Sequence, residues 1–294
     1  MGAPEVWFPN LGIEIHELDT VAFELFGRTV YWYGFLICIG VILAAQIAIF
    51  EIWHRGESED DYLNVGVVGL IVSVIFSRLY YVIFSWDYYK NNLDKIFAIR
   101  EGGLAVYGGV IGAILTAYIW TRMKKRSFLE LMDIFIPGFP IAQAIGRWGN
   151  FFNREAFGGY SNGLFAMRYI ADQAKSVSEE LMDKAIYARG ATYIQVHPTF
   201  LYECIWNVCV FIVLMIFRHK KKFEGQLTAM YLIGYGCGRI WIEGLRTDQL
   251  LVGSTNIAAS QVLSGILIVI GILLFYFGLK KIKIKKSLNI TEKS

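Results

Sequence analysis

The stretch GRWGNFFNRE, residues 146–155, places an arginine and several amides at the end of an apolar run that covers residues 134–145. Arg147 and Asn150 are three residues apart, a spacing that puts both side chains on one face of a helix. A charge at the end of an apolar segment is costly unless a partner or a ligand neutralises it. Arg147 is therefore a candidate ligand-binding residue, and an ion pair with Glu155 is the simpler alternative.

A second polar stripe runs through the apolar segment around residue 240. Tyr235, Arg239 and Glu243 recur every four residues and so share one helix face, and Arg246 follows them. Pairing of Glu243 with Arg239 or Arg246 would make a self-neutralised seam, but it would not explain Arg147. Two arginines from separate segments indicate an anion site, because a planar guanidinium suits phosphate and stays charged when partly dehydrated.

Other polar residues lie at the ends of apolar segments. Tyr33 fits either an aromatic belt at a membrane interface or the lining of a site. Tyr107 stands between two glycine pairs, which favour close helix packing or a broken backbone beside a cavity that would hold its hydroxyl. Arg78 either extends outward or faces inward. His197 is most simply a solvent-edge residue, whereas Glu203, inside the next apolar run, has no partner evident from the sequence.

The composition indicates a membrane protein. The chain of 294 residues is 55% hydrophobic and 18% charged, and its mean hydropathy is +0.45; soluble domains are usually ~45–50% apolar and ~25% charged. The apolar residues form blocks that approach the ~20 residues needed to cross a hydrocarbon core of ~30 Å. We expect an all-α polytopic membrane protein with seven transmembrane helices, at about 30–53, 62–84, 103–121, 131–149, 198–217, 227–245 and 257–279.

Basic clusters follow the third, fifth and seventh predicted spans. They are Arg122, Lys124, Lys125 and Arg126; Arg218, Lys220, Lys221 and Lys222; and Lys280, Lys281, Lys283, Lys285 and Lys286. The positive-inside rule then places the N-terminus outside and the C-terminus in the cytoplasm. The predicted divisions are an extracytoplasmic N-terminal arm (1–29), spans 1–4 (30–149), a small extracytoplasmic head domain (150–197), spans 5–7 (198–279) and a basic cytoplasmic tail (280–294).

The head domain is predicted to contain an amphipathic helix around Val177–Ala188 and a turn at Arg189-Gly190. Residues 1–29 lack a basic segment followed by an apolar core, so we expect no cleavable signal peptide. The cysteines lie in apolar blocks without a CxxC pair, which predicts buried thiols rather than disulfides or a metal site; they are Cys38, Cys204, Cys209 and Cys237. The lysine-rich tail fits a membrane anchor, and no nucleic-acid partner is expected.

Five motifs, in order along the whole chain, resemble the signature of the bacterial prolipoprotein diacylglyceryl transferase family. They are YWYG at 31–34, GGLAVYGG at 102–109, GRWGNFFNRE with the following FGG at 146–159, HPTFLYE at 197–203 and YGCGRIWIEGLR at 235–246. The resemblance implies a multi-pass protein of the bacterial cytoplasmic membrane with seven transmembrane helices. Its active site would face the extracytoplasmic leaflet, and it would need no cofactor and no metal.

The resemblance also implies the reaction. The diacylglyceryl group of phosphatidylglycerol moves to the thiol of the lipobox cysteine of a preprolipoprotein, so that a thioether forms and glycerol 1-phosphate leaves. This is the first step of bacterial lipoprotein maturation, ahead of signal peptidase II. The expected partners are phosphatidylglycerol, lipobox signal peptides and the bilayer, with the protein working as a monomer. The thiolate is the nucleophile, and fixed cations stabilise the charge on the departing phosphate.

By resemblance, Arg147 and Arg239 are the essential arginines of the family, and we assign both to the phosphate. The other candidates for substrate and lipid binding are Tyr33, Asn150, Glu155, Gly158, His197, Tyr235, Glu243 and Arg246. Within this set, Glu243 and Arg246 are expected to hold Arg239 in place.

Tyr107 departs from the pattern, because many members of the family have a histidine there as a candidate base for the thiol. Tyrosine, with an unperturbed pKa of ~10, is a poor base at neutral pH. A nearby arginine could activate Tyr107, another group could take the proton, or the position could mainly orient lipid. We hypothesise that Tyr107 donates a hydrogen bond to lipid or substrate.

Other classes of membrane protein fit the sequence less well. A transporter for an anionic solute would use the same arginines but often shows paired repeats with broken helices, and no repeat is evident. An intramembrane protease would need a motif such as HExxH or a pair of aspartates within the spans, and the sequence has neither. A lipid-binding protein without catalysis would need the same arginines, so only an assay separates it from the transferase.

Overall fold

The computed structural model describes residues 2–99, 102–253, 255 and 257–291, with the backbone alone for 285–291. The end of the predicted tail, residues 292–294, therefore lies outside the described residues. The chain divides into two compact units, Met1–Ala44 with Ile136–Ser294, and Ala45–Phe135. The first unit contains Arg147, Arg239 and Arg246, and the second contains Tyr107 and Arg78.

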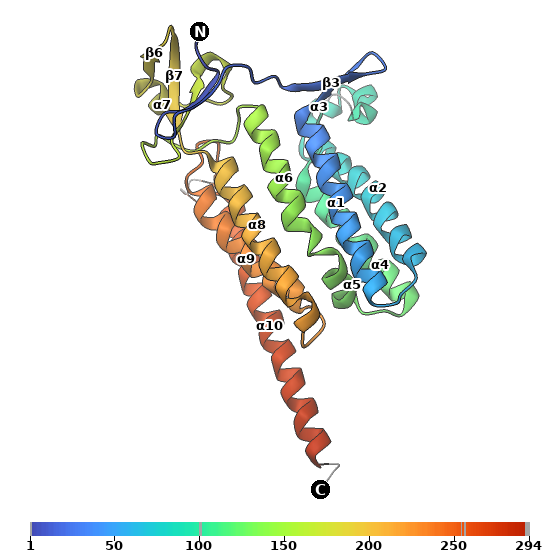
Figure 1. Ribbon diagram of the computed structural model, residues 1–294. Helices are drawn as coiled ribbons and strands as arrows, with labels where there is room; N and C mark the ends of the chain where they lie inside the picture. The colour runs from blue at the N-terminus through green and yellow to red at the C-terminus, as the bar shows by residue number, and fades with distance from the viewer. Residues whose placement is uncertain (1, 100–101, 254, 256, 292–294) are drawn as a thin grey trace. The chain divides into compact units, whose positions relative to one another are not determined.

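A five-stranded antiparallel sheet joins the N-terminal arm to the predicted head domain (Figure 1). Its strands are β1 (Val6–Phe8), β2 (Ile13–Ile15), β5 (Met167–Ile170), β6 (Ile186–Ala188) and β7 (Ala191–Val196), in the order β2-β1-β5-β7-β6. The prediction of a mainly helical membrane protein is confirmed, but the sheets show that the fold is not all-α. The strands are only 3 to 6 residues long, and β1 pairs with β5, which follows some 160 residues later. Alternation over so few residues is a weak signal in the sequence.

The predicted amphipathic helix at 177–188 was also largely wrong. Helix α7 covers only Glu179–Asp183, begins where Ser178 accepts a hydrogen bond from Leu181, and gives way to strand β6. The predicted turn at Arg189-Gly190 is confirmed, because it connects β6 to β7 with φ values of +53° and +85°. Two successive positive φ angles are typical of the tight hairpin turn that matches strand twist. Residues 186–188, which the longer helix would have included, instead form β6 and pair with β7.

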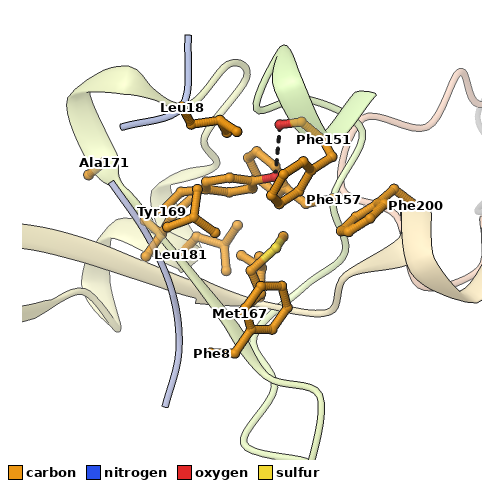
Figure 2. Packing of buried hydrophobic residues seen from close by; sticks show 12 residues of the cluster. Phe8, Leu18, Phe151, Phe157, Met167, Tyr169, Ala171, Leu181 and Phe200 are labelled. Carbon is orange, nitrogen blue, oxygen red and sulfur yellow. Dashed lines mark hydrogen bonds between the residues drawn. The ribbon is translucent and has the colours of Figure 1, made fainter. Parts of the chain in front are cut away.

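An apolar core under the sheet holds the end of the GRWGNFFNRE segment (Figure 2). Phe151 packs against Phe200 with ring centroids 4.8 Å apart, and Phe157 packs against Tyr169 at 5.9 Å. The Tyr169 hydroxyl donates a hydrogen bond of 3.2 Å to the Phe151 carbonyl. Burying one such side chain contributes ~1.5–3 kcal/mol, so this core fixes the segment that follows Arg147.

The helices of the first unit pack in a row. They are the N-terminal part of α1 (Trp32–His54), α6 (Gly138–Phe152), α8 (Thr199–Phe217), α9 (Gln226–Glu243) and α10 (Ala259–Thr291). Helix α6 packs on α8, α8 on α9 and α9 on α10. The same unit contains the hairpin β3 (Val21–Leu25) and β4 (Arg28–Tyr31), and the short 3-10 helices η3 (Ala171–Gln173) and η4 (Arg218–Lys220).

The second unit is built on α2 (Glu59–Phe84) and α4 (Val106–Lys124), with α3 (Trp86–Tyr89), η1 (Leu93–Phe97) and α5 (Phe128–Phe135). Gly108 lets α2 and α4 approach closely, since a Cβ atom there would lie 2.3 Å from the Phe76 carbonyl oxygen. Gly108 and Gly109 thus serve close helix packing, the first interpretation offered above. Gly102 and Gly103 instead lie before α4 in irregular backbone, with φ angles of +93° and +74°.

Four helices in the described part of the chain are long and apolar enough to cross a membrane, and the pair α5–α6 counts as a fifth if it is one broken span. The four are α1, α2, Thr199–Lys220 and Ala259–Ile284. Helices α4 and α9 lie over most of the predicted spans at 103–121 and 227–245 but are not among these candidates. The structure supports a multi-pass membrane protein, and the count of seven spans stays a prediction.

Candidate active site

Two arginines from separate helices converge on one carboxylate. Arg147 of α6 places Nε 2.8 Å from Glu203 Oε2 on α8. Arg239 of α9 places Nη1 3.0 Å and 3.1 Å from the two oxygens of the same carboxylate. The Glu203 side chain is only 5% exposed. A residue that the sequence marked merely as lacking a partner thus joins the two residues predicted to bind an anion.

Two further carboxylates complete an arginine–carboxylate cluster, which consists of Arg147, Arg239, Arg246, Glu203, Glu243 and Asp248. Arg239 Nη2 lies 2.6 Å from Glu243 Oε2, and Arg246 Nη1 lies 3.7 Å from the same atom. The predicted pairing of Glu243 with these arginines is confirmed. Arg246 also donates two hydrogen bonds, of 2.9 Å and 2.8 Å, to Asp248. The three guanidinium groups therefore face three carboxylates.

Asp248 lies after the end of α9, where burial and pairing act against each other. Burial opposes its ionisation, but the hydrogen bonds from Arg246 and the charge of that guanidinium outweigh burial and lower the pKa of Asp248 below its ordinary value. The Asp248–Arg246 pair therefore stays charged at neutral pH and holds the residues that follow α9.

The amides of the GRWGNFFNRE segment connect Arg147 to Glu155. Asn150 accepts a long hydrogen bond of 3.4 Å from Arg147 Nη1 and donates one of 3.2 Å to Glu155. Asn153 donates to the same carboxylate at 3.0 Å, and Lys175 pairs with it at 3.1 Å. The simpler alternative, a direct Arg147–Glu155 ion pair, was wrong, because Glu203 takes the arginine and Lys175 takes Glu155.

The two converging arginines differ in how many donors remain available. Both terminal nitrogens of Arg239 contact carboxylates, and its side chain is 14% exposed. Arg147 pairs through Nε, contacts Asn150 only at 3.4 Å, and is 22% exposed. Judged by the contacts of the described residues, Arg147 offers a ligand the more accessible guanidinium edge.

Gly158 and His197 hold the two ends of the predicted head domain (150–197) against the end of α9. Gly158 N donates to the His197 carbonyl at 3.0 Å, Gly159 N donates to the Leu245 carbonyl at 2.9 Å, and Gly158 bridges to Arg246. The His197 Nδ1 atom lies 3.3 Å from the Tyr202 hydroxyl. Burial lowers the pKa of His197 below its ordinary value, so the ring is neutral at pH 7. Both residues are thereby tied to the arginine–carboxylate cluster through the backbone.

Tyr33 and Tyr235 take separate positions in the same unit. Tyr33, at the start of α1, packs against Gly149, where a Cβ atom would lie 2.6 Å from the tyrosine ring, and it stays 40% exposed. Tyr235 stacks on Tyr231 at 5.7 Å and lines a small cavity beside Glu203 and Arg239. Tyr33 therefore packs against the GRWGNFFNRE segment, and Tyr235 lies beside the arginine–carboxylate cluster.

Tyr107 belongs to the second unit and is described there by itself. It is 41% exposed on α4 and lies near Tyr80, with ring centroids 6.4 Å apart. In the same unit Arg78 is buried and donates to four backbone carbonyls, those of Lys95, Ile96, Gly102 and Gly103, at 2.6–3.0 Å. Arg78 is therefore buried rather than extended into solvent, and it holds the chain that leads into α4.

One residue of the site and one that holds its segment in place were not recognised as such from the sequence. Glu203 was noticed only as a polar residue in an apolar run, and a carboxylate at that depth is itself the signal that an arginine lies nearby. Arg154, inside the GRWGNFFNRE segment, pairs with Glu5 at 2.6 Å and donates to the Leu18 carbonyl at 2.6 Å. It ties the N-terminal arm to the segment and so serves the fold. Within the described ranges, no group of three or more His, Cys, Asp or Glu side chains is arranged to hold a metal ion.

These features define a class of protein: a mainly helical multi-pass membrane protein with a buried arginine–carboxylate cluster beside a small sheet. The chain belongs to the prolipoprotein diacylglyceryl transferase family, whose model matches residues 20–277.

Individual relatives cover most of the chain. The phosphatidylglycerol–prolipoprotein diacylglyceryl transferase of Clostridioides difficile (strain 630) is 45% identical over 266 residues, which are 90% of this chain and 98% of the relative. The protein of that name from Clostridium novyi (strain NT) is 45% identical over 87% of this chain and 95% of its own length. The one from Listeria innocua serovar 6a is 43% identical over 89% and 90%. The similarity thus extends over both units.

Proposed function

We propose that this protein transfers the diacylglyceryl group of phosphatidylglycerol to the thiol of the lipobox cysteine of a preprolipoprotein and releases glycerol 1-phosphate. The family and the names of the relatives support this activity. The observation in the structure that carries the proposal is the convergence of Arg147 and Arg239, from two helices, on one point. Guanidinium groups in such an arrangement suit the phosphate of a lipid head group.

The reaction replaces a carbon–oxygen bond by a carbon–sulfur bond. The substrate thiol loses its proton, and the thiolate attacks the glycerol carbon that carries the phosphate. As the carbon–oxygen bond breaks, its electron pair moves onto the leaving phosphate oxygen. Fixed guanidinium groups stabilise this growing charge more strongly than the charge of the intact lipid, and so lower the barrier. Arg147 and Arg239 have this role in the proposal.

The neighbouring residues take supporting roles in the proposal. Asn150 orients Arg147 through its hydrogen bond, and Glu155 orients Asn150. Glu243 and Arg246 position Arg239. Gly158 and His197 hold the two ends of the predicted head domain (150–197) beside Arg246. Tyr33 and Tyr235 contact the lipid in this proposal. Tyr107 donates a hydrogen bond to lipid or substrate, which leaves the thiol proton to another group.

The arrangement in the membrane is part of the same proposal. Seven spans, an outside N-terminus and the basic cytoplasmic clusters would place the head domain and the active site toward the extracytoplasmic leaflet of the bacterial cytoplasmic membrane. Lipobox signal peptides emerge on that side, so both substrates would meet there. The protein would act as a monomer, with 1–29 and 150–197 outside and 280–294 in the cytoplasm.

A single assay tests the activity. Purified protein is incubated with phosphatidylglycerol and a lipobox peptide, and mass spectrometry measures whether the peptide gains one diacylglyceryl group. A peptide with serine in place of cysteine is the control and should stay unmodified. A protein that binds phosphatidylglycerol but leaves the cysteine peptide unmodified would be a lipid-binding protein, and the proposal would be wrong.

A further inference from the structure

We propose that Glu203 is an exchangeable counter-ion, which competes with the phosphate of the lipid for Arg147 and Arg239 and helps to expel the phosphate product. The inference rests on the proposed function, since it concerns how the same site binds and releases its ligand. It makes Glu203 a positioning residue of the site.

The first argument is the use of donors. Glu203 accepts from Arg239 Nη1 with both oxygens, at 3.0 Å and 3.1 Å, while Arg239 Nη2 is 2.6 Å from Glu243. Both terminal nitrogens of Arg239 therefore contact carboxylates. Arg147 meets Glu203 only through Nε, so a phosphate can reach its terminal nitrogens directly, but a phosphate that also contacts Arg239 needs the Nη1 group that Glu203 occupies. Because a carboxylate and a phosphate are alternative acceptors for one guanidinium, the two anions exclude each other there.

The second argument is charge. The arginine–carboxylate cluster pairs three guanidinium groups with three carboxylates, so it has no surplus positive charge to bind an anion. Two anions held on one guanidinium pair in a buried place would also repel each other. Binding of the phosphate between Arg147 and Arg239 therefore requires Glu203 to move away from at least one of them.

The third argument is that the structure offers Glu203 a second position. A cavity of ≈ 10 Å³ lies beside it, lined also by Asn207, Tyr235 and Arg239. Asn207 is one turn from Glu203 on the same face of α8. It is 3% exposed, and its Oδ1 atom has no hydrogen-bond partner among the described residues.

The unpaired Asn207 atom is an acceptor, which a carboxylate cannot satisfy, so the part of this amide that can receive Glu203 is its NH2 group. A cavity of this size holds about one water, which is close to the size of a carboxylate oxygen. The Asn207 NH2 group can donate to an oxygen in the cavity, and Tyr235 also lines it. The cavity can thus accept one oxygen of Glu203 when the carboxylate leaves the arginines.

The exchange has a consequence for turnover. The phosphate of glycerol 1-phosphate is a monoester and carries more negative charge than the phosphodiester of the lipid, so the arginines hold the product more tightly than the substrate. Return of Glu203 to Arg239 competes with the product and speeds its release. Glu203 thus lowers affinity for the product and keeps the site able to turn over.

The test measures binding of glycerol 1-phosphate to three variants of the detergent-purified full chain. E203Q keeps the size of the side chain and removes the competing charge, so its inhibition constant for glycerol 1-phosphate should fall by about tenfold or more. Its kcat should fall as well, because product release slows. N207L removes the amide from the cavity, so glycerol 1-phosphate should bind several-fold more weakly. E180Q, in an exposed ion pair with Lys184, is the control and should match the unmodified protein.

The proposal is overturned if folded E203Q binds glycerol 1-phosphate no more tightly than the unmodified protein. If E203Q fails to fold, a structure of the unmodified protein with glycerol 1-phosphate decides instead. Glu203 should then lie more than about 4 Å from Arg239 Nη1, beyond ion-pair distance, and a Glu203 that still contacts both arginines refutes the exchange. Product binding is measured without turnover, so failure of the proposed function, seen as an unmodified lipobox peptide, is a separate result.

Discussion

Replacing Gly158 by alanine would insert a methyl group against His197, the start of α8 and the residues that follow α9. The new Cβ atom would lie 2.8 Å from His197 Cβ and 2.8 Å from the Leu245 carbonyl oxygen, with Thr199 Cγ2 at 3.3 Å. Contacts below 3 Å with backbone atoms force the backbone to shift. Overpacking of this kind costs ~1–3 kcal/mol, so we expect the free energy of unfolding to fall by that amount.

The shift also reaches the arginine–carboxylate cluster, because Gly158 bridges to Arg246. A displacement of about 1 Å in residues that position a reacting group can cost on the order of 100-fold in rate. We therefore expect Gly158→Ala to reduce kcat/KM by one to two orders of magnitude, in addition to its effect on stability.

Gly159→Ala is a matched control, since nothing lies within 4 Å of a Cβ atom at Gly159 and its φ is not positive. The assays are the unfolding midpoint in detergent and the rate of lipidation of a lipobox peptide. The reasoning is refuted if the two alanine variants lose stability and activity equally, or if Gly158→Ala behaves like the unmodified protein.

Three further predictions concern other residues. Arg147→Lys should lose most of its kcat/KM, because lysine lacks the planar pair of donors that binds a phosphate through two hydrogen bonds. Full activity of this variant would contradict a bidentate contact. Tyr107→Phe should raise KM for phosphatidylglycerol and keep turnover, and lost turnover with intact lipid binding would show that Tyr107 acts on the thiol. Burial lowers the pKa of His197 from its ordinary value of 6.5, so the unfolded chain takes up a proton at higher pH than the folded one. Stability should therefore decline as pH falls from about 6.5 through the folded pKa, and His197→Gln should flatten that decline; equal pH profiles of unfolding would count against the burial.

The helical part of the fold followed from local patterns. Long apolar runs predicted helices at 30–53, 62–84 and 198–217, because a buried or lipid-facing helix needs an apolar surface along its whole length. The stripe of Arg239 and Glu243 is likewise local, since residues four apart on a helix meet whatever surrounds them. Their ion pair was therefore predictable without knowledge of the fold.

The sheet and the central carboxylate depended on contacts between distant residues. Strand β1 pairs with β5, which lies some 160 residues later in the chain. A three-residue strand has too little alternation of apolar and polar residues to indicate that it is a strand or which strand it pairs with. Glu203 joins Arg147 and Arg239 because α6, α8 and α9 pack side by side, and no spacing within one helix could have indicated that. By itself, the sequence determined which residues carry charge into the apolar segments, and these residues led to the prediction of an anionic ligand. Only the tertiary structure decided that both arginines share one counter-ion, because that contact exists only once three helices have packed together.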